Sequence, residues 1–469
     1  MRNAALCCAL TAVAGARSHG PASPRQQVGE LSREEVIQWH NTLYESTNVL
    51  SAPGGGSSAL RGWAMVALGM FEASNAVDQR YTPYFAADVF NVPRGIQVAS
   101  REGVTQRIAV ARAAQVVLDG LFAPPPSEPA NPLGPMRRFA HAQQFAIQTA
   151  AIDPDEPAYI AGMELGTLIG DQILSDRVGD GHPPQDTPVV NGSQWYEYQY
   201  DLPYFPGPAQ SAGYPGVRPF GVPAFGLDGG EVTYVAPPLP RSSSEFAAQW
   251  EETFSYGTSD PSRSRRTPET DATAAFHDGN FGSQIGDIID VLASAAPDAL
   301  PAGTDLLRIL ALTAMSCNDA HSNHWFWKYF YLVGRPITQY RQVPVDQADG
   351  LGEQRDEEWG GASSMELVTN QNPEHPSGHA SRTNALTASF RAAFGDDMKF
   401  RTISYSQPSA PARAYDSFTS FEEEVMASRT YGGVHWRESG FAGQDMARRV
   451  TSYIWGRHLL PIESGTPAV

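Results

Sequence analysis

Apolar side chains recur at helical spacing along most of this chain, whereas the alternation typical of strands is scarce. A Ser32-Arg33-Glu34-Glu35 capping box opens the first such stretch, which ends near Leu50. The others are residues 60–77, 103–121, 136–152, 158–174, 246–254, 271–295, 306–330, 377–394, 421–428 and 435–455. A helix with one apolar face must bury that face against another element. The sequence therefore predicts an all-α fold.

Three stretches interrupt this helical pattern. Residues 124–135 form a proline-rich connector, and residues 341–376 form a polar loop. Residues 181–240 are rich in Pro, Gly and aromatic side chains and have no helical period. Because disordered segments are poor in aromatic residues, we expect this stretch to be an ordered excursion that wraps the helices. We treat residues 17–469 as a single domain, with N-terminal helices and the wrapping loop in 17–240 and a C-terminal bundle in 241–469.

Composition excludes some classes of partner. The chain has 469 residues, of which 41% are hydrophobic, and a formal net charge of -18. A chain of this length can bury a large core. Excess acid opposes binding to a nucleic-acid backbone or to an anionic membrane surface. We therefore expect no nucleic-acid and no membrane partner, and any anion site must be built from a few local cations.

The first residues resemble a secretory signal peptide. Arg2 gives a positive start, residues 4–16 are apolar and small, and Ala14-Gly15-Ala16 fits a small-x-small cleavage site. The stretch is too short to span a bilayer. We therefore predict a signal peptide at residues 1–16 and a secreted protein, with a frayed N-terminal tail as the alternative.

Cysteine usage follows from that prediction. Cys7 and Cys8 would leave with the signal peptide, so Cys317 would remain alone and no internal disulfide could form. A secreted chain without disulfides must draw its stability from core packing. Cys317 lies in an apolar helical stretch, which favours a buried thiol over a nucleophile.

The first of three segments that can carry chemistry contains Lys328 and Arg335. Seven residues separate them, which places them two turns apart on one face of a helix whose end Pro336 marks. Two cations near a helix C-terminus also suit the helix dipole. Alone, this segment fits an ordinary solvated face.

The second segment, Pro376-Ser377-Gly378-His379, opens an apolar helix. Free backbone N–H groups at a helix N-terminus make a ready anion site. Ser377 can donate its hydroxyl, Gly378 lets an anion approach the backbone, and His379 projects from the first turn. A plain N-cap with a surface histidine is the alternative.

The third segment contains Arg429 and His435. Ser420 and Glu423 are expected to cap the helix that ends at Arg429, and a Gly-Gly turn would carry His435 onto the next helix. A helix–turn–helix corner with a core histidine is the alternative.

Together the three segments supply what a tetrahedral oxyanion needs. Lys and Arg side chains neutralise its charge, and Arg adds bidentate geometry. One histidine can act as axial ligand or nucleophile at the central atom, while the other donates or accepts a proton. We therefore predict an oxyanion site formed by Lys328, Arg335, Ser377, Gly378, His379, Arg429 and His435.

The pattern Lys-x6-Arg-Pro, Pro-Ser-Gly-His and Ser-Arg-x5-His resembles the one shared by vanadium-dependent haloperoxidases and type 2 phosphatidic acid phosphatases. Residues 428–436 and residues 318–320 look like the haloperoxidase branch, and residues 219–240 are similar to its bacterial and algal members. The resemblance is strong over the second half of the chain, whereas the first half agrees only in being helical. It implies two packed four-helix bundles, with the anion site in the C-terminal one.

The resemblance also implies a cofactor and roles. The cofactor would be vanadate, with phosphate able to occupy the same site. His435 would bind vanadium axially, His379 would be the acid/base residue, and Lys328 would polarise bound peroxide. The equatorial oxygens would be balanced by Lys328, Arg335, Arg429, Ser377 and the Gly378 amide. The implied reaction uses hydrogen peroxide to oxidise bromide, iodide or chloride to a hypohalous-acid-like species, which halogenates a small organic acceptor. Homo-oligomerisation is implied by analogy with large members.

Two positions depart from the family pattern. Members often carry Asp four residues after the metal-binding histidine to orient it; this chain has Ser439 there and Glu438 one residue earlier, about 100° around the helix. Bromide-preferring members often have a second histidine seven residues before His379, where this chain has Asn372; His375 lies nearer, on the loop side. The orienting partner and the halide preference are therefore open.

Three alternatives to this interpretation are open, and the first two use the residues of the predicted oxyanion site. In a secreted acid phosphatase, His435 would attack phosphorus and His379 would protonate the leaving group. A degenerate protein would only bind phosphate. A zinc site would use His375 with His379, or His321 with His324, but a proline interrupts the first pair and no carboxylate pattern completes the second.

Overall fold

The computed structural model describes residues 31–48, 55–85, 102–123, 133–182, 189, 191–200, 202, 212–278, 283–346, 350–361 and 369–462. The predicted signal peptide lies outside the described residues, so secretion stays a prediction. Most of the proline-rich connector, residues 124–132, also lies outside them.

The described residues are mainly helical. The helices are α2 (Arg33–Asn48), α3 (Gly55–Asp78), α4 (Glu102–Leu121), α5 (Leu133–Thr149), α6 (Pro157–Asp176), α7 (Ser244–Gly257), α8 (Pro268–Phe276), α9 (Ser283–Ser294), α10 (Gly303–Tyr331), α11 (Pro336–Gln342), α12 (Gly378–Phe394), α13 (Phe418–Tyr431) and α14 (Arg437–Trp455). Two short strands, β1 (Phe400–Thr402) and β2 (Arg413–Tyr415), pair antiparallel with Phe400 opposite Tyr415. The all-α prediction is confirmed.

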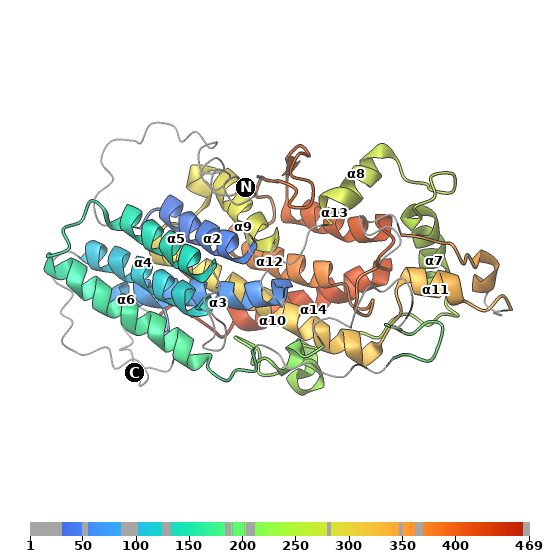
Figure 1. Cartoon of the computed structure of the whole chain (residues 1–469), viewed down its shortest axis with the longest axis horizontal. Helices are drawn as coiled ribbons and strands as arrows, with labels where there is room; N and C mark the ends of the chain where they lie inside the picture. Colours follow the sequence, from blue (N-terminus) through green and yellow to red (C-terminus); the bar gives the residue numbers. More distant parts are fainter. Residues whose placement is uncertain are drawn as a thin grey trace.

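Helix α10 belongs to two bundles of helices. It packs against α3, which packs against α4, and α4 in turn packs against α6. It also packs against α12 and α14, and α13 packs against both of those helices. Figure 1 shows α2 to α6 gathered at one end of the molecule and α12 to α14 toward the other, with α10 running between them. The two bundles therefore share one long central helix.

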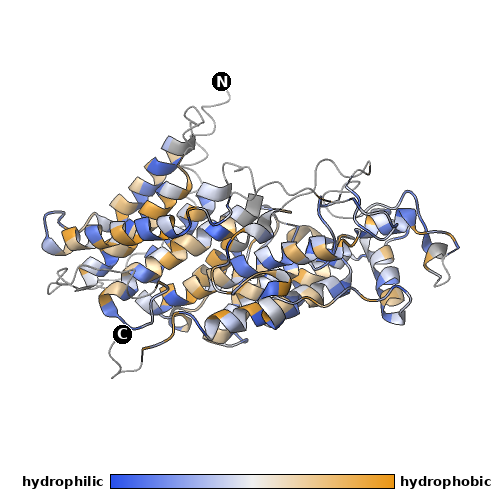
Figure 2. Cartoon of the chain, turned by 90° about the horizontal axis from the view of Figure 1, so that it is seen from below, coloured by the Kyte–Doolittle hydropathy of each residue, from blue (hydrophilic) through white to orange (hydrophobic). Residues whose placement is uncertain are grey.

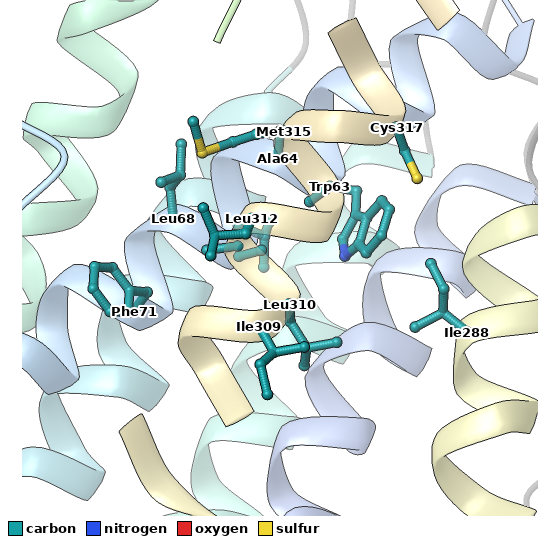
Figure 3. Close-up of a cluster of buried hydrophobic side chains, with 14 of the residues drawn as sticks. Trp63, Ala64, Leu68, Phe71, Ile288, Ile309, Leu310, Leu312, Met315 and Cys317 are labelled. Carbon is teal, nitrogen blue, oxygen red and sulfur yellow. The ribbon is translucent and has the colours of Figure 1, made fainter. Parts of the chain in front are cut away.

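The interface between α3 and α10 is apolar. Trp63 and Leu68 of α3 lie close to Leu312 and Met315 of α10, and all four are at most 1% exposed (Figure 3). Cys317 is also buried on α10, where its Sγ lies 3.9 Å from the carbonyl of Arg382 on α12, and burial raises the pKa of its thiol. The expectation of a buried thiol is confirmed. Figure 2 shows hydrophobic and hydrophilic residues interleaved along individual helices, and no helix within the described residues is long and apolar enough to cross a membrane.

Two polar side chains of α10 hold the excursion that precedes α7. The carboxylate of Asp319 accepts hydrogen bonds from the backbone N–H groups of Phe220, Gly221 and Val222, at 2.6–3.0 Å. Asn323 accepts from the N–H of residue 226 at 2.8 Å and donates to the carbonyl of residue 233 at 2.7 Å. Residues 212–240 are therefore ordered against the helices, as the aromatic content of the wider stretch predicts.

The structure confirms one predicted local detail and differs from the sequence prediction in four others. The capping box is confirmed, because Ser32 and Glu35 exchange side-chain-to-backbone hydrogen bonds. The predicted helix at 271–295 is wrong: α8 ends at 276 and α9 begins at 283. The cap of α13 is Ser417, whose Oγ accepts from the N–H of Ser420, so the predicted cap at Ser420 and Glu423 is wrong. Helix α11 and the β1–β2 hairpin were not predicted.

Glu72 on α3 makes the stability of the N-terminal bundle depend on pH. It is 3% exposed, accepts a hydrogen bond from the N–H of Tyr84 at 2.7 Å, and burial raises its pKa from 4.5 to about 8. A carboxyl whose pKa is raised on folding contributes stability below pH 4.5 that is lost as pH rises through about 8. The loss is at most about 1.4 kcal/mol per pH unit for one group.

Glu72→Gln keeps the shape and the acceptor oxygen but cannot ionise. We expect the wild type to lose stability relative to this variant as pH rises from 5 to 9, because the variant does not bury a developing charge. Urea unfolding of both proteins at each pH measures the difference, and the other titrating groups cancel between them. A difference that stays constant between pH 5 and 9 would contradict this assignment.

Candidate active site

Lys328 and Arg335 lie on different elements, so the prediction that they share a helix face is wrong. Helix α10 ends at Tyr331, and Leu332 caps it with a left-handed backbone (φ 52°). Arg335 is the N-cap residue of α11, and Pro336 begins that helix and does not mark the end of α10. The turn between the helices carries both cations to one buried place.

The buried ammonium group of Lys328 binds the loop that precedes α12. Its Nζ donates to the carbonyl oxygens of Pro373 at 2.5 Å and Glu374 at 2.9 Å. The loop is also held from the other side, because the N–H of Glu374 donates to the carbonyl of Val333 at 2.8 Å. Lys328 therefore fixes the backbone directly before the Pro-Ser-Gly-His segment.

Arg335 joins that loop to the His435 segment. Its Nε donates to the carbonyl of Asn372 at 2.9 Å, and one terminal nitrogen donates to the Asn372 side-chain oxygen at 2.6 Å. The other terminal nitrogen donates to the carbonyl of Val434 at 2.8 Å and lies 3.1 Å from Nε2 of His435. Two sequence segments about 60 residues apart thus meet on one guanidinium group. The side chain of Asn372, which replaces a histidine of some family members, is occupied by this contact.

His435 lies just before α14, because Trp436 is the N-cap of that helix. The prediction that the Gly-Gly turn carries His435 onto the helix is therefore wrong by a few residues. Its Nδ1 donates to Oε1 of Glu374 at 2.8 Å, and its Nε2 accepts from Arg335. These partners place the proton on Nδ1 and leave the lone pair on Nε2, which is the state that a metal-binding histidine needs. Burial, followed by nearby Arg335, holds the pKa of His435 well below its usual value.

Glu374 is the partner of His435, and the sequence reasoning missed it. The carboxylate is fully buried and accepts from three donors: His435 Nδ1 at 2.8 Å, the Trp436 N–H at 3.0 Å and the Ser439 hydroxyl at 2.6 Å. Burial raises its pKa, whereas the Ser439 hydrogen bond and the charge of Lys328 oppose that shift. Ser439 stands where relatives often have Asp. It thus donates a hydrogen bond to a carboxylate that another segment of the chain supplies.

Glu438, the acidic residue closest in sequence to that position, points elsewhere. Its carboxylate accepts from the N–H of Leu239 at 2.6 Å, and its own N–H donates to Gln249 at 2.6 Å. It therefore does not orient His435. Two sequence features could have indicated the partner that orients His435. They are Glu374, an acidic residue without an assigned role in the loop before Ser377, and the small polar residue Ser439.

The Ser377, Gly378 and His379 segment begins α12, as predicted. Ser377 is the N-cap, and its Oγ accepts from the N–H of Ala380 at 3.4 Å, which leaves the hydroxyl hydrogen available. Gly378 is the first helical residue, and His379 is only partly buried. The free amides of this helix end and the Ser377 hydroxyl are donors of the kind that an anion requires.

Arg429 lies in the last turn of α13, and its side chain is buried. One terminal nitrogen donates to the carbonyl of His277 at 3.2 Å and lies 3.5 Å from the Asp278 carboxylate. Its Nε is buried and has no hydrogen-bond partner among the described residues. An unpaired buried donor on a cation costs free energy that a bound oxyanion would remove. This atom is therefore a donor that a bound oxyanion could use.

The electrostatics of the site also favour an anion. Burial and the charge of Arg335 lower the pKa of Lys328 well below its usual value, although Glu374 opposes this. Burial lowers the pKa of Arg335 to about 10, and burial also lowers that of Arg429. The charges of Arg335, Lys328 and Arg429 therefore all act on the His435 ring, and an oxyanion would offset both the burial of these cations and their mutual repulsion.

The histidine pairs considered for zinc have other roles. The Nε2 of His375 donates to the carbonyl of Ala236 at 2.9 Å, and its Nδ1 lies 3.1 Å from the Ser439 hydroxyl. His321 accepts a hydrogen bond from the Trp325 indole N–H. In the described part of the chain, no three His, Cys, Asp or Glu side chains are placed to hold a metal ion together.

Comparisons with known proteins agree with this geometry. Residues 308–463 match the family model of the VCPO second helical-bundle domain. No curated protein matches the chain. Among solved structures, a bacterial vanadium-dependent iodoperoxidase has a TM-score of 0.69 and 17% identity, with 95% of this chain and 100% of that chain covered. A bacterial vanadium-dependent chloroperoxidase in its holo form has a TM-score of 0.58 and 15% identity over 92% of this chain and 98% of that chain. A bacterial vanadium-dependent chloroperoxidase in its apo form has a TM-score of 0.58 and 13% identity, with 87% of this chain and 94% of that chain covered. The chain therefore has the helical fold of the vanadium-dependent haloperoxidases, and its residues 308–463 match the second helical-bundle domain of the VCPO family.

Proposed function

We propose that the protein is a vanadate-dependent haloperoxidase that uses hydrogen peroxide to oxidise a halide to a hypohalous-acid-like halogenating species. The observation that carries this proposal is the state of His435. Its Nε2 lone pair is held by the Glu374 contact at Nδ1 and lies among three buried cations. A neutral histidine in a cationic pocket is suited to bind an oxyanion through its central atom.

The residues around His435 fit vanadate as the bound group. Lys328, Arg335 and Arg429 would neutralise its charge, and the Ser377 hydroxyl and Gly378 amide would donate hydrogen bonds to its oxygens. When bound, vanadate would act as a Lewis acid that makes an oxygen of hydrogen peroxide electrophilic toward halide. His379, which is only partly buried, would exchange protons with substrates.

Phosphatase chemistry would use the same donors and the same histidine. The match to the VCPO second helical-bundle domain and the likeness to an iodoperoxidase and a chloroperoxidase favour halide oxidation. We therefore propose hydrogen peroxide, a halide and a small organic acceptor as the substrates.

The test is halogenation of a simple diketone by purified full-length protein with peroxide and each of chloride, bromide and iodide. The assay is run on vanadate-free protein, after addition of orthovanadate, and after addition of orthovanadate with excess phosphate. Hydrolysis of p-nitrophenyl phosphate is measured in parallel. We expect halogenation that requires vanadate and is suppressed by phosphate. Vanadate-inhibited release of phosphate without halogenation of any kind would establish the phosphatase instead.

A further inference from the structure

His324 lies on α10 one helical turn before Lys328 and is fully buried. Its Nδ1 donates to the backbone carbonyl of His321, so the ring proton is on Nδ1 and Nε2 carries a lone pair. Burial, with the nearby charge of Lys328, holds the pKa of His324 well below its usual value, which agrees with a neutral ring. None of the roles assigned above uses this side chain.

The Nε2 of His324 points at the start of α12. A Cβ placed on Gly378 would lie 2.9 Å from this nitrogen, compared with 3.3 and 3.5 Å from the adjacent ring carbons. Nitrogen is thus the ring atom nearest the residue whose amide is expected to bind the oxyanion. A Cβ at position 378 would lie closer to this nitrogen than side-chain atoms ordinarily approach, so a larger residue there would require the imidazole or the helix start to shift.

This nitrogen has no hydrogen-bond partner among the described residues. Two neighbouring donors are directed elsewhere, because Lys328 donates to the carbonyls of Pro373 and Glu374 and the Trp325 indole donates to His321. A third cation, Arg382 on α12, is near enough for its charge to act on His324. A buried acceptor that stays unpaired is costly and is uncommon in folded proteins. Because this nitrogen faces Gly378, a donor bound at the start of α12 could pair with it.

A protonated oxyanion provides such a donor. Lys328, Arg335 and Arg429 can only donate, so they favour any tetrahedral anion and do not distinguish an oxygen that carries hydrogen. A neutral imidazole nitrogen can only accept, so it recognises an O–H group. An acceptor beside Gly378 would therefore select oxyanions with at least one hydroxyl.

We propose that Nε2 of His324 is a further residue of the oxyanion site and accepts a hydrogen bond from a hydroxyl oxygen of the bound anion. The inference rests on the proposed oxyanion site, and vanadate and phosphate share the chemistry that it recognises. Sulfate, which has no proton near neutral pH, lacks that chemistry and serves as the control anion.

The experiment is calorimetric titration of vanadate-free full-length protein with inorganic phosphate, orthovanadate and sulfate at neutral pH. His324→Phe removes the acceptor. His324→Gln places an amide oxygen near the Nε2 position, whereas His324→Asn reaches only the Nδ1 position. We expect His324→Phe and His324→Asn to bind phosphate and vanadate about tenfold more weakly, as loss of one charge-assisted hydrogen bond implies. His324→Gln should stay within about threefold of wild type, and sulfate affinity should not change in any variant.

Failure of this inference is distinguishable from failure of the proposed site. Wild-type protein that binds none of the three anions would overturn the site itself. Unchanged phosphate affinity in His324→Asn and His324→Phe, or an equal loss of phosphate and sulfate affinity, would overturn the role of His324 and leave the site standing. Circular dichroism confirms that each variant is folded, and the Gln and Asn pair decides the question if the Phe variant is not.

Discussion

Replacing His435 with alanine should abolish vanadate-dependent halogenation and lower the affinity for vanadate by more than about 100-fold. Loss of an outer-shell partner of a metal ligand typically costs about 10–100-fold in metal affinity, and His435 is placed to be the ligand itself. Its Nε2 lone pair lies 3.1 Å from a terminal nitrogen of Arg335. Glu374 cannot substitute, because it reaches only the far side of the ring.

The matched control for that variant is His40→Ala. His40 is equally buried but lies on α2 in the other bundle, where its Nδ1 contacts the carbonyl of Val36 (Figure 1). We expect this control to affect stability and not vanadate affinity. Calorimetry with orthovanadate and the diketone assay provide the two measurements. Vanadate affinity of His435→Ala within about threefold of wild type would show that another residue is the ligand.

Replacing Glu374 with glutamine should lower vanadate affinity by about 10- to 100-fold, the second largest effect that we expect. The amide oxygen of glutamine can still accept from His435 and Trp436, so the geometry survives. The negative charge that makes the imidazole a stronger donor to a metal does not survive. Glu374→Leu removes the acceptor as well, so it should lose more affinity and also stability, because three buried donors are left unpaired.

Glu438→Gln is the matched control for Glu374→Gln. Both are acidic residues near Ser439, and both become an isosteric amide, but Glu438 faces Leu239 and not His435. We expect vanadate affinity to stay within about twofold of wild type in this control. Equal losses in the two variants would argue for a general effect of charge. A loss of vanadate affinity confined to Glu438→Gln would show that Glu438, and not Glu374, supports His435.

Much of the fold follows from local sequence signals. Helical periodicity located nearly all of the helices of two or more turns, because contacts between residues three and four apart depend only on the local chain. The helix start at Ser377 was also readable, since a Ser-Gly pair after proline supplies the cap and the free amides locally. Errors occurred where a break depends on few residues, as between α8 and α9.

The residues of the site could be predicted from the sequence, but the contacts between them could not. Three local motifs named the seven residues, because each motif combines charge, hydroxyl and imidazole groups at short spacing. Arg335 was placed on the wrong element, since the left-handed residue that ends α10 early is Leu332, a residue type that rarely adopts this backbone, and not the nearby Gly334. Whether these side chains bind vanadate is a prediction that the experiments above test.

The sequence by itself determined the helical class, the helix that opens at Ser377 and the chemical types of the site. Only the tertiary structure decided that Glu374 orients His435 and that His324 faces Gly378. The partners in these contacts are 61 and 54 residues apart in the chain. Such contacts depend on how α10, α12 and α14 pack, and burial then selects the hydrogen bonds that can form. The spacing of residues along the chain does not indicate which of these hydrogen bonds form. Glu374 can therefore take the place of the carboxylate that was expected at position 439.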